Sequence, residues 1–133
     1  MENSQSKPPL ELSNCMRPIP DLGNHLILDF FDTDVDLDNF ELLDAKLREI
    51  LSHTTVTIEN FSYKKFDPQG VTILYLLSES HFSIHTWPES KTCAIDFYHC
   101  GPRSTINLKI AEERLCDYFG WENCSSLLLL RRG

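Results

Sequence analysis

The spacing of hydrophobic positions predicts two helices in this chain. From Asp36 or Asp38, as the cap, to about Ser52, apolar residues recur three and four positions apart, as on one face of a helix. These residues are Leu37, Phe40, Leu43, Leu47 and Ile50. A second helix is expected from a cap at Ser104 to Gly120. Its apolar face carries Leu108, Ala111, Leu115 and Phe119.

Short apolar or alternating segments predict six strands around these helices. They span residues 24–31, 55–63, 71–77, 81–87, 93–100 and 125–130. The expected order is β-α-β-β-β-β-α-β, and tight turns between the central strands favour antiparallel pairing. Two helices on one face of such a sheet make a two-layer α/β (α+β) sandwich. The other face needs a cover, so we expect a homodimer that packs sheet on sheet.

Composition indicates one globular domain in a chain of 133 residues with 41% hydrophobic residues. We place this domain at residues 21–133, after a polar, proline-bearing N-terminal arm, residues 1–20, that we expect to be flexible. A net charge of −8 argues against nucleic acid or anionic membrane as a partner. Five cysteines without a secretory signal are typical of reduced thiols in a cytoplasmic protein.

The stretch Ser78 to Glu89 carries the most specific chemistry, because it sets a Glu79-Ser80 bond into a segment that otherwise alternates like a strand. Ser80 Oγ can add to the Glu79 carbonyl and turn the amide into an ester. Loss of the Ser80 α-proton then releases Glu79 as a carboxylate, and the dehydroalanine left behind hydrolyses to a pyruvoyl group and ammonia. These steps need a base, an acid and a donor to the oxyanion.

Strand alternation suggests where such helpers could come from. His81, Ser83, His85 and Trp87 share one face of their strand, and the next strand presents its even-numbered residues from Thr92 to Cys100 on one face. An antiparallel pair could thus bring His85 and Cys100 to one cavity near Ser80, although a slip of one residue would swap the faces.

A zinc site is the competing interpretation of the same region. His81, His85, Cys93, His99 and Cys100 are suitable ligand types. However, the histidine pair lacks a helical setting and no Cys-x-x-Cys is present, so we expect no metal.

The Ser-Glu-Ser-His and Ile-His-Thr-Trp-Pro-Glu motifs between Ser78 and Glu89, with Ala94-Ile95-Asp96 and Cys100-Gly101 after them, resemble the S-adenosylmethionine decarboxylase proenzymes of the short, bacterial type. The resemblance runs from Gly23 to Arg132. It implies self-cleavage between Glu79 and Ser80 into residues 1–79 and 80–133, with a covalent pyruvoyl cofactor made from Ser80. It also implies decarboxylation of S-adenosylmethionine (AdoMet) for spermidine synthesis.

The resemblance assigns roles to further residues. His85 matches the histidine that removes the α-proton during processing, and Thr72 matches a hydroxyl residue that supports this step. Cys100 matches the acid that protonates the product. Phe66 and Trp87 fall at aromatic positions near the adenine, and Glu89 falls near the ribose hydroxyls.

The chain departs from the family pattern at Ser90-Lys91-Thr92, where an aromatic, a glycine and another aromatic are usual. This segment adjoins the expected substrate pocket. Two alternatives therefore stay open: a pyruvoyl-dependent arginine or ornithine decarboxylase on the same scaffold, and a non-catalytic homologue that regulates an active partner.

Overall fold

Six strands and two long helices make up residues 21–132, the part of the chain that the computed structural model describes; the expected N-terminal arm, residues 1–20, lies outside the described residues. The strands are β1 (Asp21–Phe30), β2 (Ile58–Lys65), β3 (Val71–Leu77), β4 (Ser80–Trp87), β5 (Thr92–His99) and β6 (Cys124–Arg132). The helices are α1 (Phe40–Leu51), α2 (Ser104–Phe119) and the short 3₁₀ helix η2 (Pro88–Ser90). The expected order of elements is confirmed.

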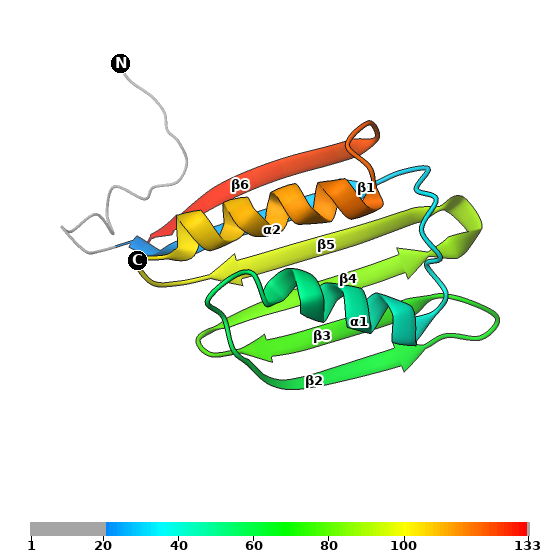
Figure 1. Cartoon of the computed structure of the whole chain (residues 1–133), viewed down its shortest axis with the longest axis horizontal. Coiled ribbons are helices and arrows are strands. Elements are labelled where there is room, and N and C mark those ends of the chain that lie inside the picture. Colours follow the sequence, from blue (N-terminus) through cyan, green and yellow to red (C-terminus); the bar gives the residue numbers. More distant parts are fainter. Residues whose placement is uncertain (1–20, 133) are drawn as a thin grey trace, which may run out of the picture.

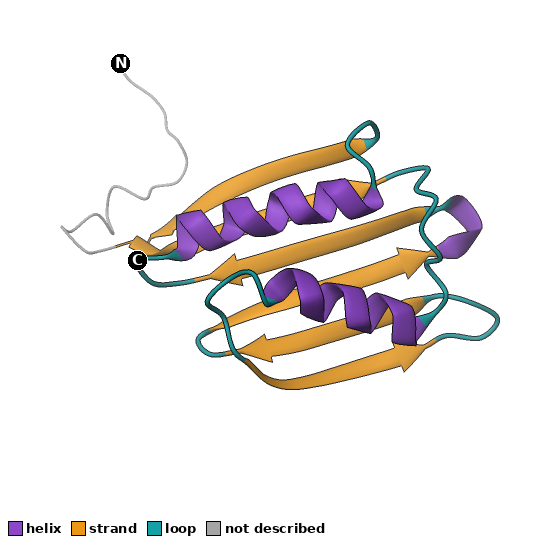
Figure 2. Ribbon diagram, viewed as in Figure 1, coloured by secondary structure: helices purple, strands orange, loops and turns teal. Residues whose placement is uncertain are grey.

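The strands form one sheet in the order β2-β3-β4-β5-β1-β6, and every neighbouring pair is antiparallel (Figure 1). Both long helices lie across the same side of this sheet (Figure 2). The expected two-layer sandwich is therefore confirmed.

The core lies between the sheet and the helices, because alternate residues of each strand point toward the helices. In β3, Val71, Ile73 and Tyr75 are buried. The intervening Leu74 and Leu76 are 49% and 57% exposed on the opposite, open face. Burial of one side of the strand and exposure of the other fixes which face each side chain occupies.

Helix α1 begins later than expected. Its N-cap is Asn39, whose Oδ1 accepts the backbone N–H of Leu42 at 3.1 Å. The expectation that Asp36 or Asp38 caps this helix is wrong, because the Asp38 carboxylate is engaged by the β2–β3 hairpin instead. Ser104, expected as a cap, is the first residue of α2 and follows the N-cap Arg103.

The open face of the sheet is apolar toward both edges and polar at its centre. Leu127 and Leu129 of β6 are 53% and 41% exposed. At the centre, the side chains of His25, His81 and Asp96 contact one another from β1, β4 and β5.

Within residues 21–132, no helix combines the length and the apolarity needed to cross a membrane.

Candidate active site

The bond expected to be cut lies in the tight turn between β3 and β4. Leu77 and Ser80 are paired across the turn, so only Ser78 and Glu79 connect the two strands. Glu79 has a φ of 65°, in the left-handed region. This conformation costs a residue other than glycine about 1 kcal/mol. The peptide that Ser80 would attack is therefore held by a strained residue.

Cys100 lies directly against this peptide. Its Sγ donates to the Glu79 carbonyl oxygen at 2.6 Å, and its backbone N–H donates to Ser80 Oγ at 3.2 Å. Ser80 Oγ and Cys100 Sγ are 4.0 Å apart. The thiol thus donates to the oxygen on which negative charge develops when the serine adds to the carbonyl.

A cleft of about 330 Å³ adjoins the Glu79-Ser80 bond on the side of Cys100 and His99. Arg103 and Thr55 also line it. Ser80 itself is only 8% exposed. The expected nucleophile is therefore shielded, while the cleft beside it would leave room for water and for the products of the expected cleavage.

His85 lies at the other end of β4. Across β4 and β5 it is paired with Ala94, and it lies five positions after Ser80, about 16 Å along the strand. Its Nδ1 is 3.1 Å from Thr72 Oγ1 on the neighbouring strand. The expectation that His85 and Cys100 meet at one cavity near Ser80 is thus not met within a single chain. The faces were predicted correctly, but the distance along β4 keeps the two residues apart.

The three expected substrate-binding residues gather at the His85 end. The rings of His85 and Trp87 are stacked with centroids 6.4 Å apart, and Glu89 follows in η2. Phe66 lies on the hairpin between β2 and β3, which is brought to this end by the pairing of Thr72 with His85. Phe66 and Trp87 are 44% and 45% exposed, so both rings present open apolar surface.

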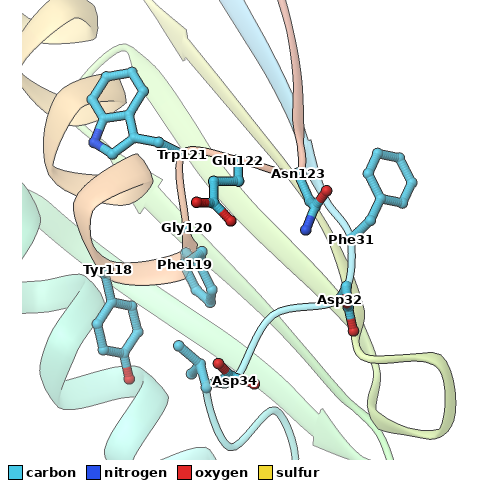
Figure 3. A pocket seen from close by; sticks show the side chains of 10 residues that line it. Phe31, Asp32, Asp34, Tyr118, Phe119, Gly120, Trp121, Glu122 and Asn123 are labelled. Carbon is cyan, nitrogen blue, oxygen red and sulfur yellow. The ribbon is translucent and has the colours of Figure 1, made fainter.

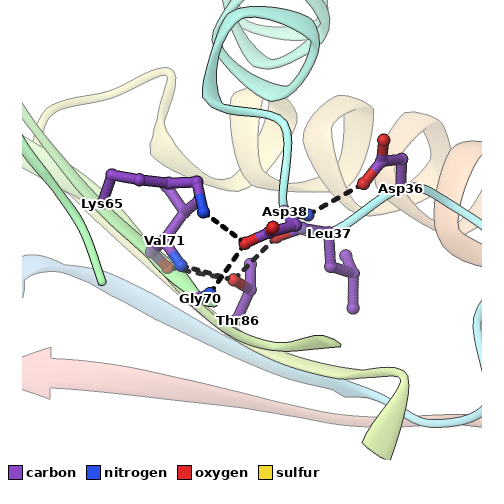
Figure 4. A network of polar contacts seen from close by, with 7 residues as sticks. All are labelled: Asp36, Leu37, Asp38, Lys65, Gly70, Val71 and Thr86. Atoms are coloured by element: carbon purple, nitrogen blue, oxygen red, sulfur yellow. Dashed lines mark hydrogen bonds and ion pairs between the residues drawn. The ribbon is translucent and has the colours of Figure 1, made fainter. Parts of the chain in front are cut away.

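Asp38 fixes the hairpin that carries Phe66 (Figure 4). Its Oδ1 accepts from Lys65 Nζ at 2.6 Å and from the Gly70 backbone N–H at 2.8 Å. These two bonds, that of Lys65 first, lower the pKa of the Asp38 carboxyl. Next to it, Thr86 Oγ1 donates to the Leu37 carbonyl at 2.9 Å. The loop before α1 therefore holds both the hairpin and the end of β4.

The cluster at the centre of the open face has the residue types of a metal site. The ligand atoms of His25, His81 and Asp96 lie within 4.8 Å of one another, the one such trio in the described part of the chain. However, Arg131 Nη1 lies 3.4 Å from His25 Nδ1, and a guanidinium can only donate. His25 Nε2 must then carry the proton that it directs at Asp96, 2.7 Å away. A ligating histidine instead donates its second N–H to an acceptor, so this trio suits a hydrogen-bonded carboxylate better than an ion.

The ligands of the zinc alternative do not gather either. Cys93 is buried under the helices, whereas His81 and His85 are exposed on the open face. Burial, and after it the charge of Asp29, raises the pKa of the Cys93 thiol to about 12. Cys93 is therefore a core residue that stays protonated at neutral pH.

Another cleft, of about 550 Å³, lies between the β1–α1 loop and the α2–β6 loop (Figure 3). Trp121, Asp34 and Glu122 line it, but none of the residues expected to act in the chemistry does. Lys91 Nζ lies 3.6 Å from Asp34 Oδ1. This cleft is separate from the chemistry at Ser80.

Two contributors to the site have no local signal in the sequence. Asp38 reaches partners 27 and 32 residues away, and its position before a helix suggested only a cap. Asn107, in α2, contacts the residue before Cys100. Both were missed because these contacts exist only in the folded chain.

A strained Glu-Ser peptide facing a thiol, at the end of an α/β sandwich, is typical of a proenzyme that cuts its own backbone. The sequence matches the S-adenosylmethionine decarboxylase family over residues 24–132. The chain belongs to this family, which confirms the family resemblance inferred from the sequence.

Known proteins of this family are similar over much of the chain. An S-adenosylmethionine decarboxylase proenzyme of Thermosipho melanesiensis is 41% identical over 81 residues, which are 60% of this chain and 62% of that protein. The alignment thus covers less than two thirds of that relative. A proenzyme 2 of Bacillus cereus is 44% identical over 90 residues, 67% of this chain and 72% of that protein. The crystal structure of adenosylmethionine decarboxylase from Aquifex aeolicus superposes with a TM-score of 0.76 at 28% identity, covering 85% of this chain and 92% of that one.

Proposed function

We propose that this protein is a pyruvoyl-dependent decarboxylase of AdoMet that makes its cofactor by cutting itself between Glu79 and Ser80. The observation that carries the proposal is the contact of Cys100 Sγ with the Glu79 carbonyl oxygen, 2.6 Å, beside Ser80 Oγ. Cleavage would yield residues 1–79 and 80–133. The product would feed spermidine synthesis in the cytoplasm, where the free thiols of the described chain would persist.

The residues around Ser80 fit the formation of this group. Ser80 Oγ adds to the Glu79 carbonyl carbon, the peptide C–N bond breaks and an ester forms. The Cys100 thiol donates to the oxyanion, and release of the left-handed Glu79 favours the cut. Proton loss from the Ser80 Cα then expels the Glu79 carboxylate, and water converts the remaining dehydroalanine to the pyruvoyl group with loss of ammonia.

When present, the pyruvoyl group accepts the electrons released as CO₂ leaves. The chain supplies the rest of the site. In this proposal, Cys100 would return a proton to the product carbon. Phe66 and Trp87 offer flat surfaces to an adenine, and Glu89 can accept hydrogen bonds from two ribose hydroxyls.

We also propose that the active form is a homodimer in which each site is shared. Thr72 and His85 lie at one end of β4, and Ser80 and Cys100 lie at the other. If two open faces pack about a two-fold axis that crosses the strands, each Ser80 end lies over the His85 end of the second copy. The exposed leucines of β3 and β6 would then be buried, and a base would reach the Ser80 α-proton.

The second candidate substrate is a free amino acid, arginine or ornithine. Ser90-Lys91-Thr92 keeps this alternative open, because the segment directly follows Glu89 and departs from the aromatic-glycine-aromatic pattern usual in the family. Lys91 is held there in a left-handed turn with φ 55°, close to Asp34. Neither amino acid has the ribose hydroxyls that Glu89 would bind, so Glu89 would be left without a partner.

The test is CO₂ release from carboxyl-labelled AdoMet, arginine and ornithine, measured side by side on wild-type protein, Glu89→Gln and the control Glu122→Gln. We expect AdoMet to have the highest kcat/KM and Glu89→Gln alone to reduce it. A higher kcat/KM with arginine or ornithine overturns the AdoMet assignment. Release of CO₂ from none of the three leaves the non-catalytic homologue as the function.

A further inference from the structure

A buried row of hydrogen bonds runs from helix α2 to Cys100. Asn107 has no exposed surface, and His99 is 9% exposed. Asn107 Nδ2 lies 2.9 Å from His99 Nε2, and His99 Nδ1 lies 2.6 Å from the carbonyl oxygen of Cys100. The histidine thus bridges the helix and the backbone of the residue that contacts the cleavage site.

The bonds of Asn107 determine which nitrogen of His99 carries the proton. The Thr55 backbone N–H donates to Asn107 Oδ1 at 3.3 Å, which orients the amide. Asn107 Nδ2 then donates one proton to Thr55 Oγ1, at 2.8 Å, and its other proton to His99 Nε2. A ring that accepts at Nε2 has its proton on Nδ1, and Nδ1 donates to the Cys100 carbonyl. Burial also lowers the pKa of His99, against the opposing effect of the Cys100 carbonyl, which favours the neutral ring.

We propose that His99 and Asn107 are positioning residues that fix the Cys100 peptide against the Glu79-Ser80 bond. The inference rests on the function proposed for Cys100. With the carbonyl held by His99, the N–H of the same residue donates to Ser80 Oγ and its thiol donates to the Glu79 carbonyl. All three polar groups of Cys100 are therefore held at once.

Strand β1 packs closely against the backbone of His99 and Cys100. A Cβ added to Gly23 in β1 would come within 2.5 Å of the His99 carbonyl oxygen and 3.0 Å of Cys100 Cα. The backbone therefore cannot relax toward β1. Without the bond from His99, the carbonyl side of Cys100 is no longer tied to helix α2 through Asn107, and we expect the thiol to be held less firmly against Glu79.

The first test compares two substitutions of His99 by the rate of self-cleavage. Asparagine places an N–H donor at the same distance along the side chain as His99 Nδ1, whereas leucine has none. We expect His99→Leu to slow conversion of freshly synthesised precursor by about 10- to 100-fold, as a displaced catalytic group does. His99→Asn should stay close to wild type, and Asn107→Ser, which frees the ring, should also be slow. Intact mass against time gives the rates.

A matched control separates positioning from a loss of stability. Tyr75→Phe removes a different hydrogen bond of the interior, from the Tyr75 hydroxyl to Asp44 Oδ1, 2.6 Å, away from Cys100. It should cleave at the wild-type rate. The melting temperature of each variant shows whether the comparison is made at similar stability.

A second readout needs neither cleavage nor substrate. In chains that also carry Ser80→Ala, iodoacetamide labelling of Cys100 is followed by peptide mass, with the buried Cys93 as internal reference. His99→Leu and Asn107→Ser should be labelled faster at Cys100, because the thiol is released, while His99→Asn and Tyr75→Phe should not.

The proposal is overturned if His99→Leu is cleaved and labelled at the same rates as wild type. It is also overturned if His99→Leu and His99→Asn slow self-cleavage to the same extent. If His99→Leu does not fold, the comparison of His99→Asn with Asn107→Ser decides in the same way. A wild-type enzyme that releases no CO₂ from AdoMet refutes the proposed substrate, but both readouts still decide the role of this pair.

Discussion

Thr72 Oγ1 and His85 Nδ1 lie 3.1 Å apart, at the end of β4 that is remote from Ser80. The register fixes this pair, because Thr72 is the direct partner of His85 across β3 and β4. His85 thus has its hydrogen-bond partner in its own chain, about 16 Å along the strand from the serine that it would process. If His85 is the base proposed for Ser80, it would reach the serine across an interface between two chains.

Mixing two inactive variants should therefore restore activity. In a heterodimer of Ser80→Ala and His85→Ala chains, one shared site carries both defects and the other carries neither. Random assembly makes half of the dimers mixed, so co-expression should recover about a quarter of the wild-type activity. CO₂ release from labelled AdoMet measures the recovery.

The control is co-expression of Ser80→Ala with Cys100→Ala. Both residues lie at the same end of one chain, so each site of the mixed dimer carries one lesion and neither site is intact. This pair should therefore not recover activity, and neither should Ser80→Ala with the double variant Ser80→Ala/His85→Ala. Absence of recovery in the first mixture would show that each chain builds its own site.

Self-cleavage should be visible in the mass of the purified protein. We expect two fragments, residues 1–79 and 80–133, the second blocked to Edman degradation by its pyruvoyl group. Ser80→Ala removes the nucleophile and should leave one full-length chain without activity. Intact-mass spectrometry checks both, and a Ser80→Ala chain that is still cut at this bond would contradict the assignment.

Asp38→Asn should weaken substrate binding more than it slows turnover. The change reduces the charge that holds Lys65 and the Gly70 N–H, so the hairpin with Phe66 becomes looser while Ser80 and Cys100 are untouched. We expect KM for AdoMet to rise by about tenfold and kcat to change little. Asp36→Asn is the control, because Asp36 accepts only from the Asp38 backbone within this network. An equal rise of KM in both variants would argue against the role of the hairpin.

Asp96 should contribute stability that is lost in acid. Burial alone would raise the pKa of this carboxyl, but hydrogen bonds from Ser83, His25 and His81 outweigh burial and lower it. The unfolded chain then binds its proton at higher pH than the folded one. The stabilisation is present above about pH 4 and is lost as the pH falls through the folded pKa.

Asp96→Asn should accordingly lower the melting temperature at neutral pH and flatten its decline below pH 4. The measurement is melting temperature against pH in the Ser80→Ala background, where one covalent chain unfolds. Asp34→Asn is the control, since the Asp34 side chain is fully exposed. Parallel curves for wild type and Asp96→Asn would be evidence against the contribution of this carboxylate.

The fold was largely predictable because its signals are local. The three- and four-residue period of Leu43, Leu47 and Ile50 marks one face of α1 regardless of its surroundings, and all three are buried. The boundaries were less predictable. Asp36, Asp38 and Asn39 are all good caps, and the choice of Asn39 depends on Lys65 and Gly70 drawing Asp38 away from the helix.

The residues of the candidate site could be named from the sequence, and their roles stay predictions, but their geometry could not be predicted. The motif around Ser80 names His85 and Cys100, and strand alternation gives their faces. Only the register, which pairs His85 with Ala94, separates them. The contact of His99 with Asn107 joins a strand to a helix, and no periodicity in the sequence encodes it.

Strand β1 would belong to the fragment that ends at Glu79, yet it lies between β5 and β6, which would both belong to the fragment that begins at Ser80. The two products of the proposed cleavage would therefore be interleaved within one sheet. To separate them, the ladders on both sides of β1 and the ladder between β3 and β4 must all break. The cut protein thus remains one folded body until it unfolds. Reassembly then becomes an encounter of two different peptides, with a yield that depends on their concentration.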